Sequence, residues 1–316
     1  MSVAVELRHI SKRFPGVIAN KDVSMKVETG TVHALVGENG AGKSTVMKIL
    51  YGMQRPDGGE ILVNGQSVNF KNPNDAIDAS IGMVHQHFML ADNFTVLENI
   101  ILGAEPKHGI TIDFAAARKK VADMSAAYGL DVDPDILVEE LGVGQRQRVE
   151  ILKVLYRGAR ILIFDEPTAV LTPQEIEELM KIIRNLIDEG KSIILITHKL
   201  NEIKAVADRC TVLRKGKYVG TVDVATTSKE EMAELIQAIS KFRRARTQEK
   251  KAKAYIHMCE EIADVENMIN HMMAKDSWNH ETEDKRKYRI MGLDRIRKQT
   301  LKTFLPELNS VLKYYD

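Results

Sequence analysis

The stretch GENGAGKS, residues 37–44, has the residue types and spacing of a loop that binds phosphate. Its glycines let backbone N–H groups turn toward phosphate oxygens, and a helix that begins directly behind them adds positive potential. Lys43 is expected to reach the β- and γ-phosphates of a nucleotide, and the Ser44 hydroxyl is expected to bind Mg²⁺. An apolar run, ALVG, precedes the loop and STVMKILYG follows it, which is the strand-then-helix context that this motif requires. A glycine turn without a ligand is the alternative.

Two carboxylates, Asp165 and Glu166, end the apolar run ILIFDEP. Asp165 at the strand end is expected to hold Mg²⁺, whereas Glu166 points elsewhere and is placed to polarise an attacking water. His198 follows another apolar run, ILITHK. Because strand ends on one parallel sheet gather at the ligand crevice, His198 is expected to contact the γ-phosphate. A solvated acidic turn and a structural histidine are the alternatives.

Two further side chains are candidates for the same site. Gln86, in MVHQHFML, follows a short strand-like run, and its amide is expected to join the Mg²⁺ or the attacking water. For its neighbours His85 and His87, loop packing is favoured over a metal site, because no further ligand cluster is nearby. Phe14, in SKRFPG, precedes the second strand and is a candidate to stack on adenine, with a core phenylalanine as the alternative.

The elements that must position these residues follow from the hydrophobic pattern. Residues 1–36 alternate polar and β-branched residues and predict strands, and Asn64-Gly65 predicts a hairpin within GEILVNGQSV. Residues 93–156 predict helices. Beyond them, RILIF and KSIILIT predict buried strands, with the amphipathic helix TPQEIEELMKIIRNLIDEG between them. This alternation indicates an α/β fold with a largely parallel sheet and helices on its faces.

Composition narrows the class of protein. The chain has 316 residues with 45 Lys+Arg against 44 Asp+Glu, and this balance does not point to nucleic acid. Two distant cysteines, Cys210 and Cys259, make no disulfide framework and favour a reducing cytosol. The start MSVAVELRHI predicts no signal peptide, and no apolar run approaches the roughly 20 residues that span a bilayer. Any membrane association is therefore expected to be peripheral and to depend on a partner.

Taken in chain order, these residues resemble an ABC-type ATPase over residues 1–238. The matching elements are Phe14, GENGAGKST, Gln86, LGVGQ, ILIFDEP, LTP and His198, and their joint order is specific to the family. The resemblance implies a P-loop ABC ATPase fold with a RecA-like core, an antiparallel β subdomain and an α-helical subdomain. It also implies ATP and Mg²⁺ as cofactors, with ATP contacted by a set of phosphate-loop residues: Gly37, Asn39, Gly40, Gly42, Lys43, Ser44 and Thr45.

The resemblance also gives a role to LGVGQ, residues 141–145, which we term the signature loop. In this family two domains pair head to tail, and each signature loop closes over ATP held by the other domain. The backbone N–H groups of Gly144 and Gln145 are then expected to point at an anion. The usual motif has serine where this chain has Gly142, and the missing hydroxyl removes a hydrogen bond worth roughly 1.5–3 kcal/mol. We therefore expect a weakened but functional site, with a simple helix-capping turn as the alternative.

The remaining residues, 239–316, are predicted to form an all-α tail after a boundary near residue 238. A basic run, SKFRRARTQEKKAKA, opens this tail, and a solvated connecting helix is favoured over a surface for anionic lipid or nucleic acid. The ending IRKQTLKTFLPELNSVLKYYD resembles, over few residues, the C-terminus of the 5-bromo-4-chloroindolyl phosphate hydrolysis family. Amphipathic packing is favoured over metal binding for four residues whose spacing fits no common ligand pattern: His257, Cys259, His271 and His280.

The segment IGMVHQHFMLADNFTVLENIILG resembles, more narrowly, the ATP-binding subunit of simple-sugar and nucleoside importers. The expected function is ATP hydrolysis that energises import through a membrane permease, at the cytoplasmic face of the cell membrane. The expected partners are permease subunits, a second nucleotide-binding domain and, indirectly, an extracytoplasmic substrate-binding protein, with no nucleic acid.

Importer subunits of this group resemble two ATPase halves in tandem, whereas no second phosphate loop follows residue 238 here. The pairing domain is therefore expected from another copy or from a separate chain, and a truncated or fused chain is the alternative. Two other classes of function stay open at this point. One is a soluble ABC ATPase that acts on the ribosome or on DNA. The other is a nucleotide-dependent binding module whose helical tail engages a partner.

Overall fold

The computed structural model describes residues 2–108, 111–228 and 232. The chain divides into two units, Met1–Ile239 and Ser240–Asp316, and all the described residues belong to the first. The predicted helical tail lies outside the described residues, together with its basic run and its candidate metal ligands. Within the described ranges, no helix is both long enough and apolar enough to cross a membrane.

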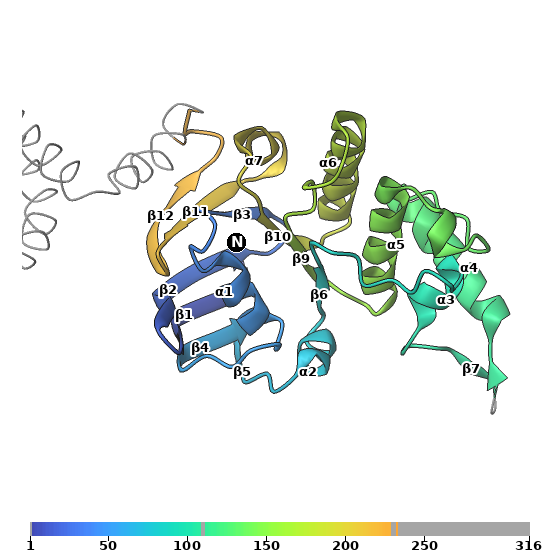
Figure 1. Cartoon of the computed structure of the whole chain (residues 1–316), viewed down its shortest axis with the longest axis horizontal. Helices are drawn as coiled ribbons and strands as arrows, with labels where there is room; N and C mark the ends of the chain where they lie inside the picture. The colour runs from blue at the N-terminus through green and yellow to red at the C-terminus, as the bar shows by residue number, and fades with distance from the viewer. Residues whose placement is uncertain (1, 109–110, 229–231, 233–316) are drawn as a thin grey trace, which may run out of the picture. The chain divides into compact units, whose positions relative to one another are not determined.

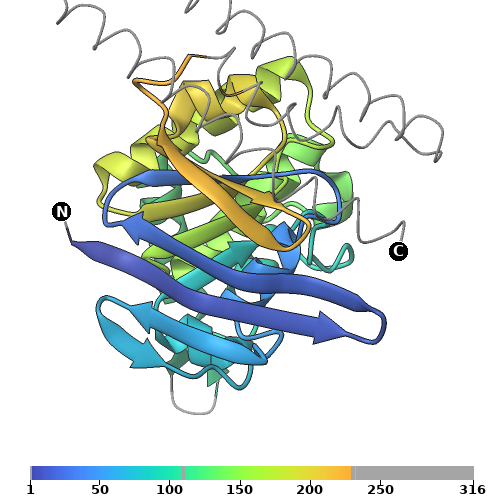
Figure 2. The same cartoon turned by 90° about the vertical axis from the view of Figure 1, so that its left-hand side faces the viewer.

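An antiparallel sheet of four strands forms one layer of the first unit, in the order β2-β1-β4-β5. Figure 2 shows its long strands β1 and β2 crossing the side of the molecule that faces the viewer. The turn at Asn64 and Gly65 has φ values of 50° and 79°, as the predicted hairpin requires. The bounds of the strands are Val3–Phe14 for β1, Val17–Glu28 for β2, Gly58–Val63 for β4 and Gln66–Val68 for β5.

A second sheet of six strands forms the centre, in the order β12-β11-β3-β10-β9-β6. All its neighbouring strands run parallel except β11 and β12, which confirms the predicted, largely parallel sheet. Every residue of β3, β9 and β10 is buried, as strands covered on both faces should be. The bounds are Val32–Val36 for β3, Ile81–Val84 for β6, Ile161–Asp165 for β9, Ser192–Ile196 for β10, Arg209–Arg214 for β11 and Lys217–Asp223 for β12.

Helices cover both faces of the central sheet. Helix α1, Lys43–Leu50, lies between the two sheets, and α6 and α7 lie on the opposite face of the central sheet (Figure 1). Helix α6 begins at a capping box in which Thr172 and Glu175 satisfy each other's backbone N–H groups, with Pro173 in the first turn. The remaining bounds are Pro73–Asp78 for α2, Pro173–Asp188 for α6 and Leu200–Val206 for α7.

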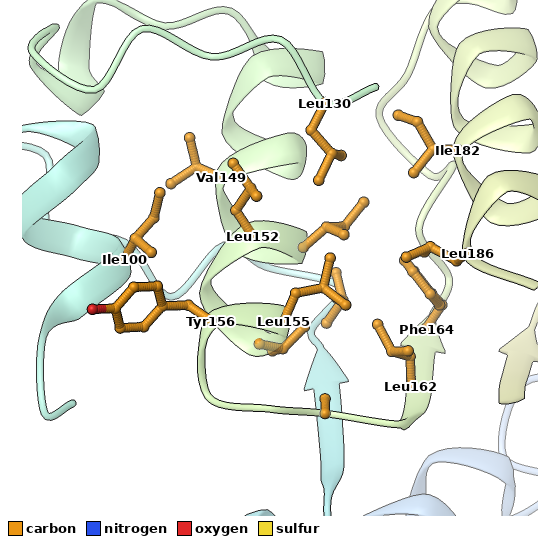
Figure 3. Packing of buried hydrophobic residues seen from close by; sticks show 14 of the residues in the cluster. Ile100, Leu130, Val149, Leu152, Leu155, Tyr156, Leu162, Phe164, Ile182 and Leu186 are labelled. Atoms are coloured by element: carbon orange, nitrogen blue, oxygen red, sulfur yellow. The ribbon is translucent and has the colours of Figure 1, made fainter. Parts of the chain in front are cut away.

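A helical subdomain stands to one side of the sheets (Figure 1). It consists of α3, Val96–Ile101, α4, Phe114–Tyr128, and α5, Val143–Tyr156, with a 3₁₀ turn at Val138–Glu140. Two antiparallel strands of two residues each, β7 (Lys107–His108) and β8 (Thr111–Ile112), interrupt the region that the sequence predicts to be helical. Figure 3 shows side chains of α5 packed between Ile100 of α3 on one side and Phe164 of β9 and Leu186 of α6 on the other. Fully burying one such leucine or valine contributes about 1.5–3 kcal/mol, so this core holds α5 firmly against β9 and α6.

Candidate active site

The phosphate loop connects β3 to α1 and contains three glycines with positive φ. Gly37, Gly40 and Gly42 have φ values of 156°, 78° and 94°. A Cβ atom at Gly37 would lie 2.3 Å from the carbonyl oxygen of Leu213, and one at Gly42 would lie 2.3 Å from that of Ala19. Strands β2 and β11 therefore press so closely on the loop that only glycine fits at these two positions.

Lys43 is the first residue of α1, and only 5% of it is exposed. Its Nζ donates to the carbonyl oxygen of Gly37 at 2.7 Å and to that of Glu38 at 3.2 Å, so the side chain curls back across the loop. Burial lowers the pKa of Lys43, while the charges of Asp165 and Glu166 act in the opposite direction. An anionic ligand in the loop would compensate the buried ammonium group better than two carbonyl oxygens do.

Ser44 and Asp165 bring two oxygen ligands together. The Ser44 hydroxyl donates to Oδ1 of Asp165 at 3.5 Å, and Asp165 is 7% exposed. Burial raises the pKa of Asp165, and the neighbouring charge of Glu166 raises it further. Hydroxyl and carboxylate oxygens suit Mg²⁺, and a divalent cation would relieve the cost of this buried charge. The donor set therefore fits the predicted metal.

Glu166 and His198 meet at the ends of the adjacent strands β9 and β10. Oε1 of Glu166 lies 3.9 Å from Nδ1 of His198, and the two side chains are 19% and 58% exposed. Glu166 has φ 49°, in the left-handed region, and its backbone N–H donates to the carbonyl oxygen of Ile196 at 3.0 Å. This fixed backbone positions the Glu166 carboxylate beside the histidine.

Gln86 and Phe14 lie at the surface. Gln86 is exposed, two residues after β6, and β6 pairs with β9, so the side chain lies at the sheet edge where Asp165 ends its strand. Phe14 ends β1 and is 39% exposed, so it is not a core residue. The Nζ of Lys12 lies 5.6 Å from its ring centroid. His85 packs edge-on against Tyr51 with 6.0 Å between ring centroids, in line with loop packing.

The signature loop leads into α5 with Gly142 as the residue before the first turn. The backbone N–H of Gly144 donates to Oε1 of Glu175 at 3.1 Å, so within this chain it meets a carboxylate of α6. The other oxygen of Glu175 accepts from the backbone N–H and from the hydroxyl of Thr172, both at 2.8 Å. Glycine at position 142 offers no capping side chain, and a carboxylate from α6 stabilises the positive end of α5 instead.

Three buried polar side chains beside the site were not identified from the sequence. The amide of Asn20 donates to the carbonyl oxygen of Gly42 at 3.2 Å and supports the phosphate loop. The amide of Gln147, on α5, donates at 2.8 Å to the carbonyl oxygen of Pro167, which follows Glu166. Glu202, on α7, is 4% exposed. Each lies on a strand or helix with an ordinary amphipathic sequence. Only their burial in the folded chain distinguishes these three side chains from exposed polar ones.

Residues 20–169 match the ABC transporter family. Over 232 residues the chain is 57% identical to the nucleoside import ATP-binding protein NupA of Lactococcus lactis subsp. cremoris, a match that covers 73% of this chain and 46% of that protein. It is 56% identical over 236 residues to the guanosine import ATP-binding protein NupO of Bacillus subtilis, covering 75% of this chain and 46% of that protein. The chain therefore spans about half the length of these curated relatives.

The fold also matches solved structures. The dimeric structure of MJ0796, a bacterial ABC transporter cassette, superposes with a TM-score of 0.61 at 25% identity. The match covers 70% of this chain and 98% of that one, so nearly the whole of a single cassette has its counterpart here.

Proposed function

We propose that this chain, whose residues 20–169 belong to the ABC transporter family, binds and hydrolyses ATP to drive import of a nucleoside or simple sugar through a membrane permease. The observation that carries the proposal is the convergence of a buried lysine, a hydroxyl–carboxylate pair and a carboxylate–histidine pair on one edge of the central sheet. Two relatives named for nucleoside and guanosine import favour a nucleoside as the cargo.

The phosphate loop binds the nucleotide in this proposal. Lys43 exchanges its bonds to the carbonyl groups of Gly37 and Glu38 for bonds to the β- and γ-phosphates. Phe14 stacks on the adenine. Ser44 and Asp165, with Gln86, hold Mg²⁺, which when bound neutralises phosphate charge. Backbone groups of the loop and of the first turn of α1 surround the phosphates: Gly37, Asn39, Gly40, Gly42 and Thr45.

Glu166 and His198 act on the reaction itself. The Glu166 carboxylate orients the water that attacks the γ-phosphorus and takes up its proton. His198 contacts the γ-phosphate and stays beside Glu166, at the separation of 3.9 Å seen here. Lys43 stabilises the charge that develops on the phosphate oxygens, so catalysis rests on position and electrostatics.

A second nucleotide-binding domain completes the site, from another copy or from a separate chain. Its signature loop, through Gly142, Gly144 and Gln145, faces the γ-phosphate, and the dimeric state of a related cassette supports this pairing. The other proposed partners are permease subunits at the cytoplasmic face of the membrane and, through them, an extracytoplasmic substrate-binding protein.

The test uses Glu166→Gln in the full chain. The amide cannot accept the proton of the attacking water, so this variant should bind Mg·ATP, release little phosphate and accumulate as an ATP-bound dimer in sedimentation. Glu178→Gln is the matched control, because Glu178 is an exposed carboxylate on α6 that pairs with Arg148. Rapid hydrolysis by Glu166→Gln would refute the role of Glu166. Failure of the unaltered chain to bind Mg·ATP would overturn the proposed function.

A further inference from the structure

A buried carboxylate on α7 joins the two loops that carry Glu166 and His198. Oε1 of Glu202 accepts from the hydroxyl of Thr168 at 2.6 Å, and Oε2 accepts from the hydroxyl of Thr197 at 2.6 Å. Thr168 and Thr197 are 2% and 1% exposed. Thr168 follows Glu166 by two residues and Thr197 directly precedes His198, so one side chain holds the backbone on both sides of the catalytic pair.

On the histidine side, Thr197 forms a turn of its own. Its hydroxyl oxygen accepts from the backbone N–H of Lys199 at 3.1 Å, which closes a tight turn with His198 between the two residues. A hydroxyl has one proton, and here that proton goes to Glu202. Glu202 therefore fixes the direction of the hydroxyl, and the hydroxyl fixes the backbone from which the imidazole projects.

On the other side, Lys199 closes the connection. Its Nζ donates to the carbonyl oxygen of Thr168 at 3.0 Å and to the hydroxyl at 3.1 Å, and lies 3.3 Å from Oε1 of Glu202. The ammonium group compensates the buried carboxylate, so each acceptor and donor of the cluster has a partner. The loop after Glu166 and the turn around His198 are thus held by one closed network.

The ion pair joins the buried carboxylate of Glu202 to the partly exposed ammonium group of Lys199, and it is poor evidence for stability because desolvation and solvent screening offset its attraction. We propose that Glu202 is instead a positioning residue, which sets the distance between the Glu166 carboxylate and the His198 imidazole for hydrolysis. This inference rests on the proposed function. Misplacement by about 1 Å in such a pair costs roughly 10- to 100-fold in rate. The affinity for Mg·ATP should fall far less than the rate, because of the proposed nucleotide and metal contacts only that of His198 is set by the network, whereas Lys43 and Ser44 hydrogen-bond elsewhere.

The test compares variants that lose the threonine hydroxyl with variants that retain it. Thr197→Val and Thr168→Val keep the side-chain shape and lose the bond to Glu202, whereas Thr197→Ser and Thr168→Ser retain it. We expect the valine variants to lose roughly 10- to 100-fold in kcat with little change in the Kd for Mg·ATP, and the serine variants to keep most of the rate. Equal kcat values for valine and serine, or parallel losses of kcat and affinity, would overturn the proposal.

Thr211→Val is the matched control for loss of a buried threonine hydroxyl. Thr211, on β11, is fully buried and bonds to His33 and to Thr221, both at 2.7 Å, outside the site. Its variant should lose stability to a similar degree and keep kcat. A comparable loss of kcat in Thr211→Val would mean that the effect at Thr197 reflects general destabilisation. That result would count against a positioning role for Glu202.

A second measurement does not require turnover. In the chain labelled with ¹⁵N-histidine, the ring resonances of His198 are assigned by their loss in His198→Gln. Thr197→Val and Glu202→Gln should shift these resonances, and Thr197→Ser and Thr211→Val should not. If the unaltered chain binds or hydrolyses no Mg·ATP, the proposed function fails, while an unmoved His198 signal in Thr197→Val refutes the role of Glu202 independently.

Discussion

Oε1 of Glu175 lies 3.1 Å from the backbone nitrogen of Gly144, so a carboxylate from α6 caps the helix that follows the signature loop. Hydrogen bonds from the backbone and hydroxyl of Thr172 lower the pKa of Glu175, and the bond from Gly144 adds to this, so the group is charged at neutral pH. In the proposed dimer, the same N–H faces a γ-phosphate. Pairing must therefore exchange one anion for another at the end of α5.

Replacing Glu175 by Gln should favour pairing. The amide oxygen still accepts from Gly144, but the negative charge no longer repels the incoming triphosphate, an effect of about 1 kcal/mol at a partly exposed helix end. We expect the ATP concentration for half-maximal dimerisation to fall by about fivefold in the Glu166→Gln background, measured by sedimentation. Glu178→Gln, one turn further along α6, should change nothing. Weaker pairing in Glu175→Gln would show that the carboxylate supports the closed site.

Restoring the missing hydroxyl should raise turnover. Gly142 has φ −66°, and a Cβ atom there would have Gln145 Oε1 at 3.8 Å as its nearest neighbour, so serine fits without strain. Gly142→Ser should add a hydrogen bond to the γ-phosphate of the facing domain, worth roughly 1.5–3 kcal/mol, and raise kcat by about tenfold or more. Gly142→Ala supplies the Cβ atom alone and should leave kcat unchanged. If Gly142→Ser shows no gain in kcat at saturating ATP, the proposed hydrogen bond from residue 142 to the γ-phosphate is wrong.

The sequence was sufficient where the signal is local. Glycine spacing predicted the phosphate loop, Asn64-Gly65 predicted the observed hairpin, and continuous apolar runs predicted β9 and β10. The rule that strand ends share one sheet edge placed His198 at the expected ligand crevice, and the structure puts its Nδ1 3.9 Å from Oε1 of Glu166, a proximity that the sequence did not predict. The β7–β8 hairpin was missed because strands of two residues leave no periodic pattern.

The contacts that complete the site depend on packing between distant elements. Gly144 meets Glu175 across 31 positions of the chain, and Thr168 meets Glu202 across 34. The T-x-x-E pattern marks Glu175 as part of a capping box but not as a partner of Gly144, and nothing in the sequence of α7 marks Glu202 as buried. Their roles follow only from how α6 packs on α5 and how α7 packs on the loop after β9.

Phe14 offers a test of the adenine position. Phe14→Ala removes an exposed ring at the end of β1 and should raise the KM for ATP about threefold to tenfold, since such stacking is worth about 0.5–1.5 kcal/mol. The value of kcat should stay unchanged, because the ring contributes to binding alone. Phe14→Trp should keep the low KM. Val17→Ala, at an exposed residue of the next strand, is the control, and an unchanged KM in Phe14→Ala would place the base elsewhere.

Asp165 is expected to lower the stability of the chain when no ligand is bound. Burial, and then the charge of Glu166, raise the pKa of Asp165 above its ordinary value of 3.8. The folded chain therefore holds this proton more tightly than the unfolded chain does. The cost of ionising the group is absent below about pH 3.8 and develops as the pH rises through the raised pKa.

Asp165→Asn should accordingly stabilise the chain while it abolishes Mg²⁺-dependent hydrolysis. The gain in free energy of unfolding should be near zero at the acid end, grow as the pH rises toward the raised pKa of Asp165 and level off above it at about 1 kcal/mol, or about 2–4 °C in Tm. Denaturant unfolding of both chains from pH 4 to 7 measures the difference, with Asp188→Asn as an exposed control on α6. A gain that is constant over this range would mean that it does not come from ionisation of Asp165. A loss of stability at pH 7 would mean that the buried carboxylate is already compensated by Ser44 and Lys43. Metal binding would then have no electrostatic cost of a buried charge to relieve.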